Sequence, residues 1–206
     1  MRKKPGHFWL DFFACFLIPA YTLLFAGSVQ WFGTNFSVIA VTGPDHYRGF
    51  IYWGVLAGGY FFVMLSRLAF TLPARWERVL ARLLAVCAVL SLAYALAIPY
   101  LPEYFPKYAA LHVLLAASAC VLLMLALLLI LLTLRRQDPF RWSKPLRTWR
   151  LITLGCGALF LIPRMVSTAL EVFFTISAAL LARRMWLLAK AQEPPGGAKG
   201  GPHGKI

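Results

Sequence analysis

Long apolar runs separated by short polar segments organise this chain of 206 residues. A membrane-spanning helix needs about 20 mainly apolar residues, because it crosses a hydrocarbon layer of about 30 Å at 1.5 Å per residue. The pattern predicts such helices at about 8–32, 49–70, 77–100 and 109–134. Pro19 is expected to kink the first of them without ending it.

The apolar region from 149 to 188 is too long for one span, because a helix of about 40 residues would measure about 60 Å. We place a break at Pro163-Arg164, since proline lacks a backbone donor and the residue before it avoids helical geometry. The break predicts a fifth span at about 147–163 and a sixth at about 167–188. It leaves residues 135–147 as a loop.

Two glycines in the second span have the spacing Gly54-x-x-x-Gly58, which lets another helix approach closely. We expect the partner to be a helix of the same chain. Dimerisation stays open as the alternative, so the possible partners include a second copy or another membrane protein.

Composition places the chain in lipid, since it is 61% hydrophobic and 14% charged, against about 45–50% and about 25% in soluble domains. The predicted fold class is all-α: a polytopic integral membrane protein with six transmembrane helices in a single bundle, over residues 1–190. The Gly- and Pro-rich tail at 191–206 is expected to be disordered and cytoplasmic.

The formal charge of +14 is distributed as a topology signal and not as a nucleic-acid surface. Lysine and arginine gather at the N-terminus, the 66–82 turn, the 135–150 loop and the C-terminal segment, with only Arg48, Lys107 and Arg164 elsewhere. Such an excess marks the cytoplasmic side of a membrane. We therefore expect cytoplasmic termini, a plasma-membrane location, no nucleic-acid partner, and anionic lipid at the basic loops.

Several polar residues fall on the predicted outer side. His112 and Glu171 each lie about one turn into a span, and Arg164 lies at the break. Ionisable groups inside a membrane must face the protein interior and are functional candidates by default. Together with residues of the loop at 33–49 they form a predicted ligand-binding layer: Asn35, Asp45, His46, Arg48, His112, Arg164 and Glu171.

A purely structural role is the competing interpretation of this layer. His112, Arg164 and Glu171 would then pair with one another and with loop backbone, and so lock the bundle. Arg164 and Glu171 would share a helix face if the sixth helix began early. On the inner side, Asp11 is expected to pair with the basic residues of the MRKK opening.

Motifs for catalysis and metal binding are missing from the sequence. Only His46 and His112 offer imidazoles on the outer side, whereas a catalytic zinc needs about three protein ligands. No GxSxG motif or phosphate-binding glycine loop occurs. The cysteines stand alone in different apolar runs and are expected to be packing residues: Cys15, Cys87, Cys120 and Cys156. We predict no catalytic residues, no metal site and no cofactor.

The six-helix pattern resembles the families grouped around the damage-regulated autophagy modulator proteins and a related bacterial domain of unknown function. The resemblance rests on internal termini, Asn35-Phe36-Ser37 after the first helix, the following helix with Gly54, and His112 at the start of the fourth. It implies a small non-enzymatic membrane protein in which the first outer loop and His112 belong to one outer-side cluster.

These observations favour a multi-pass membrane protein without enzymatic activity. The leading hypothesis is that its outer polar layer binds a lipid, a small amphiphile or a partner helix. A small solute or ion transporter and a membrane-embedded lipid-modifying enzyme are the alternatives.

Overall fold

The computed structural model describes residues 8–27 and 29–191, and this part of the chain contains helices and no strand. The helical elements are α1 (Phe8–Phe12), η2 (Phe13–Leu17), α2 (Ile18–Ala26), α3 (Phe36–Ala40), α4 (Pro44–Phe70), α5 (Arg75–Ala97), α6 (Pro106–Gln137), α7 (Pro139–Leu161) and α8 (Thr168–Lys190). The MRKK opening and the predicted tail from residue 192 onwards lie outside the described residues.

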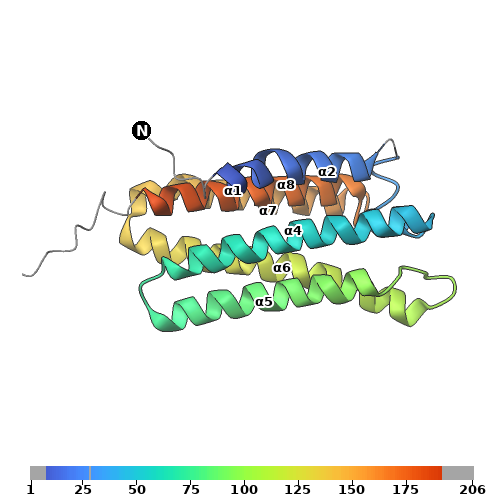
Figure 1. Ribbon diagram of the computed structural model, residues 1–206, viewed down its shortest axis with the longest axis horizontal. Helices are drawn as coiled ribbons and strands as arrows, with labels where there is room; N and C mark the ends of the chain where they lie inside the picture. The colour runs from blue at the N-terminus through green and yellow to red at the C-terminus, as the bar shows by residue number, and fades with distance from the viewer. Residues whose placement is uncertain (1–7, 28, 192–206) are drawn as a thin grey trace, which may run out of the picture.

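The long helices lie side by side and run back and forth along one axis (Figure 1). One end of the molecule holds the start of α1, the α4–α5 turn, the α6–α7 junction and the end of α8. We call it the basic end. The opposite end holds α3, the α5–α6 connection and the α7–α8 turn, and we call it the loop end.

The first predicted span is a helix with a π-helical segment in its middle. Pro19 has no N–H, and its ring crowds the preceding turn, so the chain widens over Phe13–Leu17 before α2 continues. Pro19 is predicted to kink the helix without ending it, and the helix does continue past Pro19, with a π-helical segment before it. The helix ends at Ala26, not near residue 32, because Gly27 adopts φ 56°, a left-handed conformation that suits glycine.

The predicted loop at 135–147 is wrong. Helix α6 continues to Gln137, and α7 begins at Pro139 after the single residue Asp138. The Asp138 side chain accepts a hydrogen bond from the Arg141 N–H at 3.0 Å, and Pro139 occupies the first helical turn. Asp followed by Pro is a strong helix start, and here it outweighs the polarity of the segment.

Within residues 8–27 and 29–191, five helices are long and apolar enough to cross a membrane, so the chain is a helical membrane protein. They are Phe8–Ala26, Pro44–Phe70, Arg75–Ala97, Pro106–Gln137 and Thr168–Lys190. Helix α7 has 23 residues but is not among them. Its first half carries four basic residues, which lower its hydropathy: Arg141, Lys144, Arg147 and Arg150.

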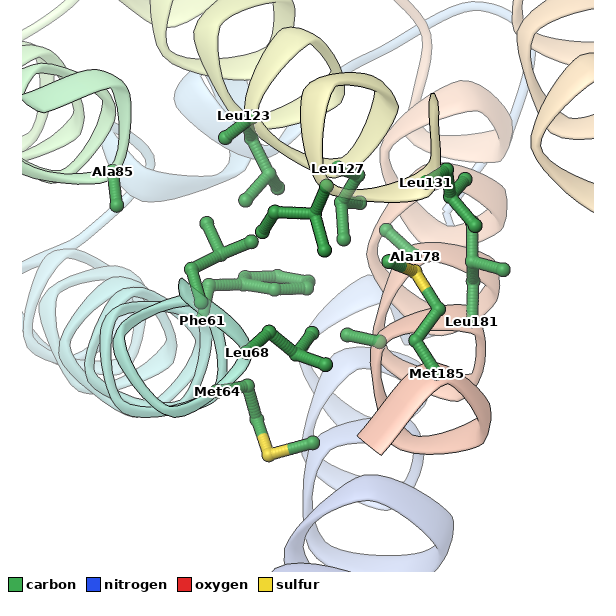
Figure 2. Close-up of a cluster of buried hydrophobic side chains, with 14 of the residues drawn as sticks. Phe61, Met64, Leu68, Ala85, Leu123, Leu127, Leu131, Ala178, Leu181 and Met185 are labelled. Carbon is green, nitrogen blue, oxygen red and sulfur yellow. The ribbon is translucent and has the colours of Figure 1, made fainter. Parts of the chain in front are cut away.

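The main core is apolar and lies between α4, α6 and α8. Figure 2 shows side chains of these helices converging there, among them Phe61, Met64, Leu68, Leu123, Leu127, Leu131, Ala178, Leu181 and Met185. Lipid tails are as apolar as these side chains, so close van der Waals packing has to hold the helices together. One ion pair also joins the first helix to α8, since Arg183 Nε donates to the Asp11 carboxylate at 2.7 Å.

Small residues allow α4, α5 and α6 to approach closely. A Cβ on Gly54 would lie 2.2 Å from Leu96 Cδ1, and one on Gly58 would lie 3.2 Å from Leu92 Cδ2. Both leucines belong to α5, which confirms that this glycine pair packs within the chain. Helix α5 in turn buries alanines at helical spacing: Ala81, Ala85 and Ala88.

We expect Gly54→Ala to lower the free energy of unfolding by about 1–3 kcal/mol, because the added methyl overpacks the α4–α5 contact. Gly59→Ala is the control on the same helix, since a Cβ there has no neighbour within 4 Å. Unfolding by titration with SDS in mixed micelles measures the difference. Equal stability of the two variants would contradict the proposed contact.

Candidate functional site

The short helix α3 forms the centre of the loop end. Asn35 precedes it in extended geometry, and its side-chain oxygen accepts the Val38 N–H at 2.9 Å. This is the ordinary N-cap arrangement, which supplies an acceptor to a backbone N–H that has no partner inside the helix. The Phe36 ring is fully buried and meets Phe25 and Trp53 edge-to-face at 5.1 Å and 5.0 Å. Cap and aromatic contacts together hold α3 against α2 and α4.

The first turns of α3 and α8 supply each other's missing hydrogen-bond partners. Glu171 Oε2 accepts the Phe36 N–H at 2.6 Å. In the reverse direction, the Thr168 N–H and hydroxyl both donate to the Thr34 carbonyl, at 2.7 Å and 3.0 Å. The Ala169 N–H donates to the Trp31 carbonyl at 3.0 Å. Four hydrogen bonds therefore tie α8 to α3 and the segment before it: three use carbonyls of that segment, and one uses the Glu171 side chain.

His112 joins α6 to the end of α5 and to α3. Its Nδ1 lies 2.8 Å from both the Ala95 carbonyl and the Ile98 carbonyl. Carbonyls only accept, so Nδ1 carries a proton, and in the neutral imidazole Nε2 is then the acceptor. Ser37 Oγ, 2.7 Å from Nε2, is therefore the donor of that bond. His112 thus satisfies carbonyls at the C-terminus of α5 and holds α3 from the other side.

The Ser37–His112 pair borders a small crevice. Its walls are Ser37, Ala40, Val41, Tyr47, Phe50, Ile98, Pro99, Tyr100 and His112, and it encloses about 170 Å³, no part of it wide enough for a water molecule. A serine bonded to an oriented histidine is an arrangement used by nucleophilic enzymes. Here both side chains are buried, at 9% and 3% exposure. In this closed geometry the pair connects helices and leaves no space for a substrate.

The predicted layer divides into a set of residues around α3 and an exposed set. Asn35, His112 and Glu171 are brought together around α3. The other predicted residues lie on the surface. Arg48 and Asp45 form an exposed pair at 3.4 Å within the first turns of α4, which begins at Pro44 and so takes up part of the predicted loop.

His46 and Arg164 complete the exposed set. His46 Nδ1 lies 2.6 Å from the Thr42 hydroxyl and is exposed. Arg164 is exposed in the α7–α8 turn, at φ 55°. Within the described chain Arg164 forms no ion pair with Glu171, because Pro163 and Arg164 occupy a turn and α8 starts only at Thr168. Of the three residues expected to lock the bundle, His112 and Glu171 are the two that form hydrogen bonds to other elements.

Sequence reasoning missed two further members of the set around α3, Ser37 and Thr168, which are both buried. Each lies within two residues of an N-cap, Asn35 or Ser167, where exposed backbone N–H groups attract polar side chains. That local signal identifies the helix starts. It does not identify partners 75 or 134 positions away in the chain. Among the described residues, no group of three or more His, Cys, Asp or Glu side chains is placed to hold a metal ion.

We expect His112→Ala to destabilise the protein by about 2–4 kcal/mol, since it leaves two carbonyls and the Ser37 hydroxyl without their partner. Ser37→Ala should cost less, about 1–2 kcal/mol, because one histidine nitrogen loses one donor. His46→Ala removes an exposed imidazole at the same end and should change stability by less than about 0.5 kcal/mol. Thermal unfolding in detergent tests this order. A neutral His112→Ala would contradict the capping role.

No family model, no curated protein and no solved structure matches this chain. The resemblance to the autophagy-modulator type of six-helix protein therefore stays a prediction, and the site is interpreted from its own geometry.

Proposed function

We propose that the chain crosses the plasma membrane six times as a single bundle and binds a zwitterionic lipid or a similar small amphiphile at its loop end, without catalysing a reaction. In this proposal α7 also crosses the membrane, as the fifth of six spans in chain order. Its 23 residues correspond to about 35 Å, enough to cross the hydrocarbon layer. Gly155 of α7 packs against the Phe173 ring of α8, since a Cβ there would lie 2.8 Å from Phe173.

Charge supports an arrangement with the basic end in the cytoplasm. This end holds the α4–α5 turn, the α6–α7 junction and the end of α8 (Figure 1), and arginines and lysines occur in the helix ends that flank the turn and the junction and in the last two turns of α8. Long basic side chains in the first half of α7 can extend towards the headgroups, which makes its low hydropathy compatible with a span. Six crossings leave both chain ends on the same side.

The topology predicts equal accessibility of the two ends of the described chain. Single-cysteine variants at Lys190 and at Phe8, in a background with the native cysteines replaced by serine, should react with the same membrane-impermeant maleimide only from the cytoplasmic side. A cysteine placed at Glu103, in the α5–α6 connection, should react only from outside. Labelling of positions 8 and 190 from opposite sides would exclude six crossings.

Glu171 is the observation that carries the binding function. It lies in the first turn of α8, at the level where the spans end, and one carboxylate oxygen accepts the Phe36 N–H. The residue nevertheless stays partly exposed. A carboxylate at this depth, reachable from outside, suits the ammonium group of a zwitterionic headgroup. Exposed Arg164 in the neighbouring turn offers a partner for the phosphate.

The surface around Glu171 and Arg164 is apolar enough to contact the acyl chains of a lipid. The end of α7 next to the turn exposes large apolar side chains, including Phe160, Leu161 and Ile162 at 47%, 70% and 76%. Gly157 faces open space, with nothing within 4 Å of a Cβ built there. The apolar main core and the narrow crevice at Ser37 support binding at one surface more than transport through the protein or catalysis.

We expect Glu171→Gln to abolish most retention of phosphatidylethanolamine by the purified protein while the fold persists. The glutamine carbonyl can still accept the Phe36 N–H, so only the charge is lost. Glu171→Leu removes the acceptor as well and should cost about 1–3 kcal/mol of stability. Native mass spectrometry of protein extracted from defined bilayers measures the retained lipid.

Arg164→Gly serves as the second variant in this experiment. Glycine suits the left-handed backbone at position 164, so the turn should be preserved or stabilised while the guanidinium is removed. Weaker retention in both Glu171→Gln and Arg164→Gly, at unchanged melting temperature, supports the binding role. Unchanged retention in both variants would leave Glu171 with a structural role alone.

A further inference from the structure

Three arginines in the first two turns of α5 have no acidic partner in the described chain. The ion pairs found there are Arg48 with Asp45 and Arg183 with Asp11, and neither involves α5. Glu77, the one carboxylate on this part of α5, is 5% exposed and turned towards α6, where Oε1 accepts the Thr133 hydroxyl at 3.3 Å. The charges of Arg75, Arg78 and Arg82 are therefore not neutralised by a neighbouring carboxylate.

The depth of these arginines makes the missing partner significant. Arg82 lies seven residues after Arg75 along α5, which is about 10 Å further from the basic end. Its guanidinium carbon lies 3.8 Å from the centroid of the Phe70 ring, and this contact holds it beside the helix. The Nε atoms of Arg78 and Arg82 are buried and have no hydrogen-bond partner. Guanidinium groups at this depth need an anion or the headgroup layer.

A shallow open groove runs along the same helix next to the arginines. It has a volume of about 710 Å³ and is lined by Arg75, Trp76, Val79, Leu80 and Leu83. The lining is basic and aromatic where α5 begins and apolar further along. Trp76 and Leu83 are 60% and 55% exposed. The groove thus has the polarity of a phospholipid, with the charged part at the membrane surface and the apolar part in the bilayer.

We propose that this groove and the three arginines bind one anionic phospholipid of the leaflet at the basic end. The guanidinium groups of Arg75, Arg78 and Arg82 donate to the phosphate and the anionic headgroup, while an acyl chain lies along Val79, Leu80 and Leu83. Charge complementarity selects an anionic lipid over a neutral one. The apolar floor favours a lipid over a soluble anion. The site is separate from the layer around Glu171 and does not depend on it.

The test compares two variants that lose the same charge at the same end. One replaces the α5 arginines: Arg75→Gln, Arg78→Gln and Arg82→Gln. The control replaces three other exposed arginines: Arg135→Gln, Arg136→Gln and Arg184→Gln. Each protein is reconstituted with equal amounts of phosphatidylglycerol and phosphatidylcholine, and native mass spectrometry measures the bound lipid.

We expect the wild type and the control to retain phosphatidylglycerol preferentially, and the α5 variant to lose that preference by about tenfold, or about 1.4 kcal/mol. Inorganic phosphate at millimolar concentration should not displace the lipid, whereas displacement would identify a site for a free anion. If both variants lost the preference for phosphatidylglycerol equally, the proposal would be wrong, and the lipid would be attracted by the overall positive charge of this end. Glu171→Gln should leave phosphatidylglycerol binding unchanged, so the two lipid sites succeed or fail separately, and circular dichroism checks that each variant is folded.

Discussion

Backbone groups at helix ends must find partners even where water is scarce, and this requirement governs the loop end of the protein. The first N–H groups and the last carbonyls of every helix lack partners within that helix. Here α8 obtains carbonyls from the segment before α3, while α3 obtains the Asn35 side chain and the Glu171 carboxylate. The end of α5 obtains the imidazole of His112. Four parts of the chain are joined by these capping contacts.

The same requirement explains why a carboxylate and a histidine occur within apolar segments. Each is a hydrogen-bonding group whose loss would leave buried backbone unpaired. Glu171 differs from His112 because it can form further hydrogen bonds. One of its carboxylate oxygens accepts the Phe36 N–H, and the residue is still partly exposed. His112 is 3% exposed, and both its nitrogens are engaged. In the proposed function the binding role therefore falls to Glu171, while the hydrogen bonds of His112 are used within the protein.

The two ends of the molecule differ in chemistry. At the loop end most polar groups are paired, and the surface charge is mixed. At the basic end, Arg183 pairs with Asp11, but several buried donors lack acceptors in the described chain, including Nε of Arg78, Arg82 and Arg141. Between them lies a core of apolar side chains in close contact. In the proposed lipid site at the basic end, headgroup phosphate oxygens would be the acceptors for these donors, since they are present at the surface of any phospholipid bilayer.

The sequence by itself determined the helical class, the approximate position of each long helix and the break at Pro163, because these follow from the length of apolar runs and from local proline and glycine chemistry. Its errors were also local: Gly27 ended the first helix early, and the Asp138-Pro139 start replaced a predicted loop with helix. Only the tertiary structure decided which polar groups meet. Ser37 and His112, Phe36 and Glu171, and Asp11 and Arg183 are 75, 135 and 172 residues apart. Such pairings depend on how each helix is rotated about its axis and on which helix lies beside it, and no local pattern encodes either.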